Sequence, residues 1–291
     1  MLQEPPASAD SSTLVAVGSP LQELHAVPAT PEYLRRMWEK RDFIAALPIE
    51  QLRTSHQATL LGNVWHLGNP MLSVAVYYVI FGILLNSSRG IDNYILWLVI
   101  GVFVYRLTSS AMSGGASAVS SNTGLMRSVR FPRAVLPLSS VFSHLLTFGF
   151  ELSIIAAVAM LTGEGMHQRW LLLPLVILLQ TTLNLGLAFF TARLNDMFRD
   201  VQQIIPFLMR LLMYASGVMF DVRSRAADGP GWVHTIIEWN PLLALIDTYR
   251  WVFLGTPVSG GELLRLVIVA LATLIVGFRF FVAAESSYGR G

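Results

Sequence analysis

Residues 201–220 read VQQIIPFLMRLLMYASGVMF, an apolar stretch of membrane-spanning length that carries Arg210 near its middle. A spanning helix needs about 20 mostly apolar residues. An arginine at the centre of such a helix costs roughly 2.5–3.5 kcal/mol on insertion scales, so it normally faces other protein or a water-filled path. The stretch therefore predicts a membrane protein that handles something polar.

The composition of the whole chain supports this reading. Of its 291 residues, 54% are hydrophobic and only 13% are charged, whereas a soluble domain carries about 25% charged residues. The arginine and lysine residues of the short loops favour an arrangement with both termini on the cytoplasmic side of a plasma membrane. We expect six spans, at about residues 70–86, 93–112, 134–161, 170–191, 201–220 and 262–283.

The ends of the chain are predicted to lie outside the spans. Residues 1–29 are rich in Pro, Ala and Ser and are expected to form a disordered cytoplasmic tail. Residues 286–291 are expected to form a cytoplasmic tail at the other end. A helix should begin at Thr30-Pro31-Glu32, with Thr30 as its N-cap. One side of this helix is apolar and the other is charged, so residues 30–67 are predicted to form an amphipathic interface helix and a lead-in to the first span. Packing against a soluble partner is the alternative.

The segment between the fifth and sixth spans is apolar but interrupted. Glu238, Asp247 and Arg250 break its apolar character, and Asn240-Pro241 should end any helix that reaches them. We therefore expect residues 230–257 to form two short helices that dip into the outer leaflet rather than a seventh span. The predicted fold is an all-α membrane protein with six spans, an N-terminal interface helix and this re-entrant outer hairpin.

The chain has no recognisable catalytic motif. Zinc-protease, nucleophile-elbow and phosphate-binding-loop sequences are all missing, and cysteine is absent, so we expect no bound cofactor or metal and no ATP hydrolysis by this chain. The net charge of +2 gives no indication of nucleic-acid binding. His144 and Glu151 are seven residues apart on one helical face, which fits either a proton relay or a hydrogen-bonded pair within the bundle.

Aromatic and basic residues within the spans indicate a possible solute path. Phe207, Arg210 and Tyr214 share one face of the fifth span, and Tyr77 and Phe81 are four residues apart in the first. Aromatic rings stack on sugars, and a buried arginine can hold phosphate through two hydrogen bonds. From the predicted span limits, neither Arg210 nor Arg106 of the second span has an acidic partner at its own depth. Ordinary packing within the bundle is the alternative reading.

A short basic segment joins the second and third spans. Residues 120–133 are predicted to form a compact, positively charged helix that ends at Phe131-Pro132. Such a helix could dock on a soluble partner, or it could be an ordinary cytoplasmic loop. The candidate docking residues are Arg127, Arg130, Phe131, Pro132 and Arg133.

Several stretches, taken in order, resemble one family. These are the segment from Leu125 to Pro137, the sequence Phe198-Arg199-Asp200-Val201, Trp239-Asn240-Pro241-Leu242 followed by Tyr249-Arg250, and the run Arg53…Leu61-Gly62…Trp65…Pro70. Together they resemble the membrane subunits of ABC-type polysaccharide exporters, which move O-antigen, teichoic acid and lipid-linked glycans. The resemblance extends over residues 31–285.

The resemblance implies a homodimer that works with two copies of a soluble ATPase, on which ATP and magnesium are bound. It also implies a coupling role for residues 120–133, a channel between the first and fifth spans, and a polyprenyl-diphosphate-linked glycan as substrate in a bacterial plasma membrane. Lys40 is the only lysine, which suggests a G+C-rich genome such as that of an actinobacterium, and hence cell-wall galactan as a substrate. A permease for a lipid or drug, and a membrane-embedded transferase, are the alternatives.

Overall fold

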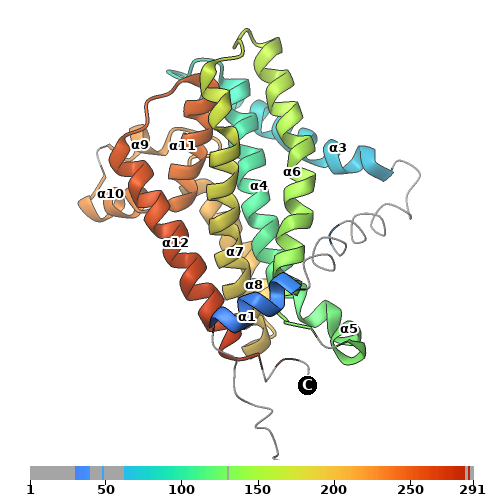
Figure 1. The fold of residues 1–291 in the computed structure, drawn as a ribbon. Helices are drawn as coiled ribbons and strands as arrows, with labels where there is room; N and C mark the ends of the chain where they lie inside the picture. The colour runs from blue at the N-terminus through green and yellow to red at the C-terminus, as the bar shows by residue number, and fades with distance from the viewer. Residues whose placement is uncertain are drawn as a thin grey trace, which may run out of the picture.

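The computed structural model describes residues 30–39, 48, 62–129, 131–227, 229–285 and 288, and every regular element within them is helical (Figure 1). The predicted tail 1–29 and Arg130 lie outside the described residues. Within the described residues, four helical segments are long and apolar enough to cross a membrane, which confirms the all-α class. They are α4 (Tyr94–Ala118), α6 (Val135–Leu161), the segment Gln168–Met197 that joins η3 (Gln168–Leu172) to α7 (Leu173–Met197), and α12 (Gly260–Val282).

The predicted first and fifth spans form shorter helices. The apolar segment Gly68–Leu84 comprises most of α3 (Gly62–Tyr77) and the π-helical turn η1 (Tyr78–Leu84), and the other is α8 (Val201–Ala215). At 1.5 Å per residue, α8 is only about 22 Å long. The prediction that the fifth helix continues to residue 220 was wrong, because the chain turns at Gly217, whose φ is +62°. Six spans therefore stay a prediction.

Helix α4 forms the centre of the bundle (Figure 1). It packs against α6, α7, α8 and α11 (Pro241–Leu254). Its side chains are apolar around most of its circumference, which is the pattern of a helix enclosed by others. Members of its fully buried core include Leu96, Leu98, Ile100, Phe103 and Val104.

Helices α7 and α12 approach so closely that their backbones touch. A Cβ atom at Gly277 would overlap the carbonyl oxygen of Gly186, and one at Gly186 would overlap the backbone of Thr273. Small residues allow this approach, which is a common way for membrane helices to associate without a hydrophobic driving force between them. The α7–α12 pair is thus the most tightly joined pair of long helices.

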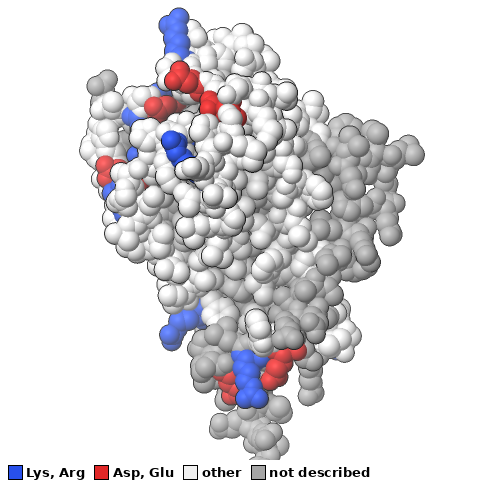
Figure 2. Space-filling view, turned by 45° about the horizontal axis from the view of Figure 1, so that its top comes forward, with Lys and Arg blue, Asp and Glu red and all other residues white. Residues whose placement is uncertain are grey.

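The short helices lie at the two ends of the long ones. Helix α1 (Thr30–Glu39) lies within the predicted interface-helix segment and runs across the lower end of the bundle in Figure 1, where α5 (Thr123–Ser128) projects. Before α5 comes the 3-10 turn η2 (Ser120–Asn122), and α9 (Val222–Arg225) and α10 (Gly231–Glu238) precede α11. Figure 2 shows charged side chains at both ends of the molecule and an uncharged band between them, as expected for a protein in a bilayer.

Candidate functional site

Helix α8 has one buried face and one exposed face. Ile205 and Met209 are buried and belong to a cluster that includes residues of α4 and α11. Phe207 and Tyr214 are 63% and 45% exposed, and Arg210 is exposed as well. Within the part of the chain that the structure describes, Arg210 has no carboxylate partner. The predicted face Phe207, Arg210 and Tyr214 therefore points away from the core of the subunit.

The first and fifth apolar segments lie side by side within the subunit. The hydroxyl of Tyr77 donates to the sulfur of Met213 at 3.9 Å, and the rings of Phe81 and Phe220 are 6.4 Å apart. Tyr105 of α4 donates to the carbonyl oxygen of Met209, which ties α8 to the central helix. The candidate residues Tyr77, Phe81, Phe207, Arg210 and Tyr214 all lie on these two adjacent segments.

The prediction that Arg106 lacks an acidic partner was wrong. Its Nε atom lies 3.3 Å from Oε1 of Glu151 on α6. Helix α4 continues to Ala118, past the predicted end of the second span, which places Arg106 about 18 Å from the inner end of its helix. Glu151 lies about 24 Å from the start of α6, a difference that the long arginine side chain can cover. We had expected His144 and Glu151 to form either a proton relay or a hydrogen-bonded pair. The structure instead pairs Glu151 with Arg106.

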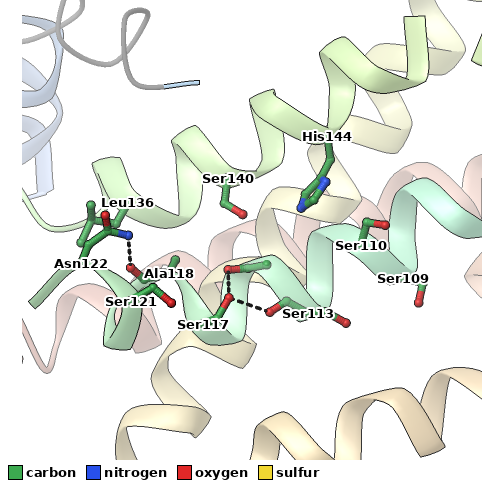
Figure 3. Close-up of a pocket in the computed structure, with 11 residues that line it drawn as sticks. Ser109, Ser110, Ser113, Ser117, Ala118, Ser121, Asn122, Leu136, Ser140 and His144 are labelled. Atoms are coloured by element: carbon green, nitrogen blue, oxygen red, sulfur yellow. Dashed lines mark hydrogen bonds between the residues drawn. The ribbon is translucent and has the colours of Figure 1, made fainter. Parts of the chain in front are cut away.

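A polar groove of about 500 Å³ runs along α4 and α6 (Figure 3). Ser110 of α4 lies opposite Ser140 and His144 of α6, whereas Ser109 and Ser113 point away from α6 in that view. The helices are close here, because a Cβ atom at Gly114 would lie 2.7 Å from Nε2 of His144. The lining consists of Ser109, Ser110, Ser113, Gly114, Ser117, Ala118, Ser121, Asn122, Leu136, Ser140 and His144.

The sequence reasoning missed this groove, although its signal is present in the chain. Ser109, Ser113 and Ser117 recur at every fourth position and therefore follow one side of α4, and Ser121 continues the spacing into η2. Small residues such as serine are enriched where membrane helices approach one another, and a row of them also makes that face polar. Ser117 bonds to backbone carbonyls of its own helix, which leaves its oxygen able to accept a further hydrogen bond.

Asn240 and Arg250 belong to the motifs between the fifth and sixth segments. Both donate hydrogen bonds to the residues at the carboxyl end of α8 and in the turn after it. The amide nitrogen of Asn240 donates to the carbonyl of Ala215 and to Ser216, and its oxygen caps α11 by accepting from Leu242 N at 3.0 Å. The predicted break at Asn240-Pro241 is confirmed, because α10 ends at Glu238 and α11 begins at Pro241. Asn240 thus satisfies backbone groups at two helix ends, which would otherwise lack partners.

Arg250 is 2% exposed and has several partners. It donates to the carbonyl oxygens of Gly217 at 2.9 Å and Trp97 at 3.4 Å, and to Asp247 at 3.2 Å. Its guanidinium lies 3.3 Å from the centroid of the Trp97 ring. Arg250 therefore links α11 to α4 and to the turn after α8.

Tyr249 belongs to the same buried region, whereas Trp239 is 58% exposed. The hydroxyl of Tyr249 donates to Gln180 at 2.8 Å, and Gln180 in turn donates to the carbonyl of Val104. The motif residues of this region therefore hold α11 against the bundle. Whether α10 and α11 dip into a bilayer stays a prediction.

An ion-pair network lies beside this region, at the start of α12. Arg223 of α9 contacts both Asp247 and Glu262. Burial alone would lower the pKa of Arg223, but the two neighbouring carboxylates outweigh it and raise that pKa. Arg223 therefore stays charged and joins three short or terminal helical segments.

The predicted coupling segment is a short helix, as expected, but it ends at Ser128 rather than at Phe131. Arg127 is exposed, and Phe131 and Pro132 are half-buried. Arg133 turns inward, where its guanidinium donates to the carbonyl oxygens of Glu285 and Tyr288. Arg133 therefore makes internal contacts with the segment that follows α12.

Apolar membrane-length helices, together with charged side chains gathered at the two ends of the molecule, are the features of a helical membrane protein. The family model described as ABC-2 type transporter matches residues 46–254, which is more than half of the chain, and the chain belongs to that family.

Curated relatives match over nearly their whole length. The chain is 27% identical over 256 residues to an O-antigen export system permease protein RfbA of Myxococcus xanthus, covering 88% of this chain and 97% of the relative. It is 26% identical over 242 residues to a protein of the same name from Klebsiella pneumoniae, covering 82% and 91%. It is also 24% identical over 253 residues to the polysialic acid transport protein KpsM of Escherichia coli, covering 84% and 94%.

Proposed function

We propose that this chain is the membrane subunit of an ATP-driven exporter that moves a lipid-linked polysaccharide across a bacterial plasma membrane. It works as a homodimer with two copies of a soluble ATPase, which hold the ATP and magnesium. Membership of the ABC-2 type transporter family and the export functions in the names of its relatives support this proposal.

The observation that carries the proposal is the exposed face of α8. Arg210 has no carboxylate partner among the described residues, and Phe207 and Tyr214 lie on the same face. An unpaired arginine in an apolar segment is stable only against water, protein or an anionic solute. A diphosphate is such a solute, and the two aromatic rings suit the apolar faces of sugars.

The groove along α4 supplies a different chemistry for the same substrate. Its lining carries no full charge of its own, and the nearby Arg106 is neutralised by Glu151. Neutral hydroxyl groups can both donate and accept hydrogen bonds, as sugar hydroxyls do. Several weak and similar sites also suit transport, because a solute must be bound firmly enough to enter and weakly enough to leave.

The proposed homodimer would cover apolar surface that a single subunit leaves exposed. Ile83 and Leu84 of η1 and Phe207 and Leu211 of α8 are each more than half exposed. Contiguous apolar surface on adjacent segments is typical of an interface or of contact with lipid. Placing these segments at a subunit interface would put Arg210 on the shared path.

Two other functions are less well supported. A transferase would need converging acid–base groups, but Glu151, Asp247 and Glu262 are each held by an arginine. A permease for a drug or a simple lipid would have little use for a row of serine hydroxyls along α4. Among glycans we favour cell-wall galactan, because the use of arginine in place of lysine suggests a G+C-rich genome such as that of an actinobacterium.

The test is reconstitution of the chain with an ATPase subunit from the same organism in vesicles supplied with lipid-linked galactan or an O-antigen-like glycan. We expect ATP-dependent movement of the glycan and no ATP hydrolysis by the chain alone. ATP turnover by the pure chain, or transport of drugs in preference to glycan, would contradict the proposal.

A second measurement uses the absence of cysteine from the chain. Single cysteines at positions 207, 210 and 214 should react with a water-soluble thiol reagent in the vesicles, and glycan should slow that reaction. A cysteine in place of the buried Met209 is the matched control and should not react. Equal protection at all four positions would mean that this face is a packed contact.

A further inference from the structure

Three distant parts of the chain meet where the coupling segment joins α6. The backbone N–H of Arg133 donates to Oε1 of Glu285 at 2.9 Å, and the backbone N–H of Ala134 donates to the hydroxyl of Tyr33 at 3.2 Å. The Tyr33 hydroxyl in turn donates to Oε1 of Glu285 at 3.0 Å. We call Tyr33, Arg133, Ala134 and Glu285 the cap cluster.

The start of α6 explains why these contacts form. The first N–H groups of a helix have no partner within the helix, and they carry partial positive charge. Ala134, the residue before α6, offers no side-chain cap, and Tyr33 and Glu285 accept hydrogen bonds from the N–H groups of Ala134 and Arg133, the two residues that lead into the helix. Burial, and next the Glu285 carboxylate, raise the pKa of Tyr33 well above its ordinary value, so its hydroxyl stays a donor.

The same contacts also hold the end of α12. The guanidinium of Arg133 donates to the carbonyl oxygens of Glu285 and Tyr288, which follow that helix. Cations are favourable at the carboxyl end of a helix. Arg133 is therefore bound to the C-terminal segment, and the next residue, Ala134, is bound to Tyr33 of the N-terminal helix.

Apolar packing reinforces these hydrogen bonds. Tyr33, Ala134, Phe281 and Tyr288 belong to one buried cluster, and Met126 of α5 packs against it. Tyr33 is 2% exposed and its ring meets that of Phe278 at 6.0 Å. A displacement of α5 thus acts on a joint that already includes α1, α6 and α12.

We propose that Glu285 and Tyr33 are positioning residues that make the coupling segment, α1 and the end of α12 move as one unit. The role of α5 as the point that receives the motion of the ATPase rests on the proposed function. The cap cluster passes that motion to α1 and to α12, so that ATP hydrolysis is converted into movement of the glycan.

The test compares variants of the reconstituted complex by the amount of glycan moved per ATP hydrolysed. Glu285→Ala and Tyr33→Phe remove hydrogen bonds but leave the aromatic packing of Tyr33 in place. Each should lower this ratio by about fivefold, the factor that corresponds to one hydrogen bond, while ATP hydrolysis and complex assembly are kept. Glu285→Gln keeps an accepting oxygen and should restore most of the ratio.

The matched control is Glu39→Gln, which removes an exposed pair with Arg35 on the same helix and should leave the ratio unchanged. A normal ratio in Glu285→Ala and Tyr33→Phe would overturn the inference, as would a parallel loss of assembly, hydrolysis and transport, since that indicates a structural role only. Absence of ATP-dependent export by the unmodified complex would instead refute the proposed function.

A second experiment tests whether α1 and the segment after α12 stay in contact during transport. Cysteines at positions 37 and 284, whose native side chains pack against the same apolar cluster, would be joined by a reducible cross-linker. The linked complex should export glycan at close to the normal rate. Export that stops until the link is reduced would show that the joint must open, and failure to form the link would contradict the packing; either result rejects the inference.

Discussion

Arg250 and Arg210 are both arginines in apolar surroundings, but the regions around them differ. Around Arg250, the carbonyls of Gly217 and Trp97, the Asp247 carboxylate and the Trp97 ring all face the guanidinium, and the side chain is 2% exposed. Around Arg210, no carboxylate of the described residues is a partner, and the side chain is exposed.

The difference teaches that the cost of a charge in an apolar segment does not by itself indicate function. A buried charge is stable when the fold supplies its partners, and its loss then damages the fold. A charge without a carboxylate partner among the described residues, such as that of Arg210, is available to an incoming solute. The number of partners therefore distinguishes Arg250, which has a structural role, from Arg210, which is a candidate functional residue.

Arg250→Ala should show the largest effect. It leaves two carbonyl groups without their donor and the Asp247 carboxylate with Arg223 as its remaining partner, and breaking a buried pair in this way costs about 3–5 kcal/mol. We expect a lower midpoint of thermal unfolding and a poor yield of folded protein, measured by size-exclusion chromatography in detergent. Arg89→Ala, at an exposed loop arginine, is the control and should behave as the unmodified chain does.

Arg210→Ala should reverse this pattern. Among the described residues Arg210 has no carboxylate partner to lose, so the midpoint of unfolding should stay the same or rise. Export should fall about tenfold or more, since a hydrogen bond to a charged group is worth about 1.5–3 kcal/mol. A clear loss of stability, with export per folded complex unchanged, would place Arg210 in the same class as Arg250.

Arg106 lies between these two cases, because it is 32% exposed and paired with Glu151. Glu151→Gln should destabilise the chain by about 1–3 kcal/mol, since it leaves the arginine with a weaker partner. Adding Arg106→Gln to that variant should recover part of the loss, as a double-mutant cycle of unfolding free energies would reveal. Additive losses would mean that the pair does not contribute to stability.

Ser113→Ala should have the smallest effect of the four. The change removes one exposed hydroxyl of the groove, and one neutral hydrogen bond is worth about 1 kcal/mol. Export should fall by no more than a few-fold, with unfolding unchanged. Ser153→Ala, at an exposed hydroxyl of α6 outside the groove, is the control, and an equal effect of both changes would argue against the groove.

Much of the fold could be predicted from local patterns in the sequence. The long apolar runs gave the positions of α4, α6, α7 and α12, and Asn240-Pro241 marked the boundary between α10 and α11. These features depend on residues close together in the chain. The end of α8 was missed, because Gly217, Asn240 and Arg250 determine it through contacts between separate segments.

The site was predictable only in part for the same reason. The exposed face of α8 follows from helical periodicity, so Phe207, Arg210 and Tyr214 were found together. The pairing of Arg106 with Glu151 depends on how far α4 continues past its apolar stretch. The inward turn of Arg133 depends on Glu285 and Tyr288, which no local pattern connects to it.

The backbone contact between Gly186 and Gly277 bears on how the subunit could deform. Two helices whose backbones touch cannot slide past each other without a clash, so α7 and α12 should move as one rigid unit. The cap cluster attaches the coupling segment to the carboxyl-terminal end of α12 in that unit. We therefore expect a force on α5 to tilt the whole subunit rather than bend it. Any opening of a solute path should then occur along the exposed face of α8.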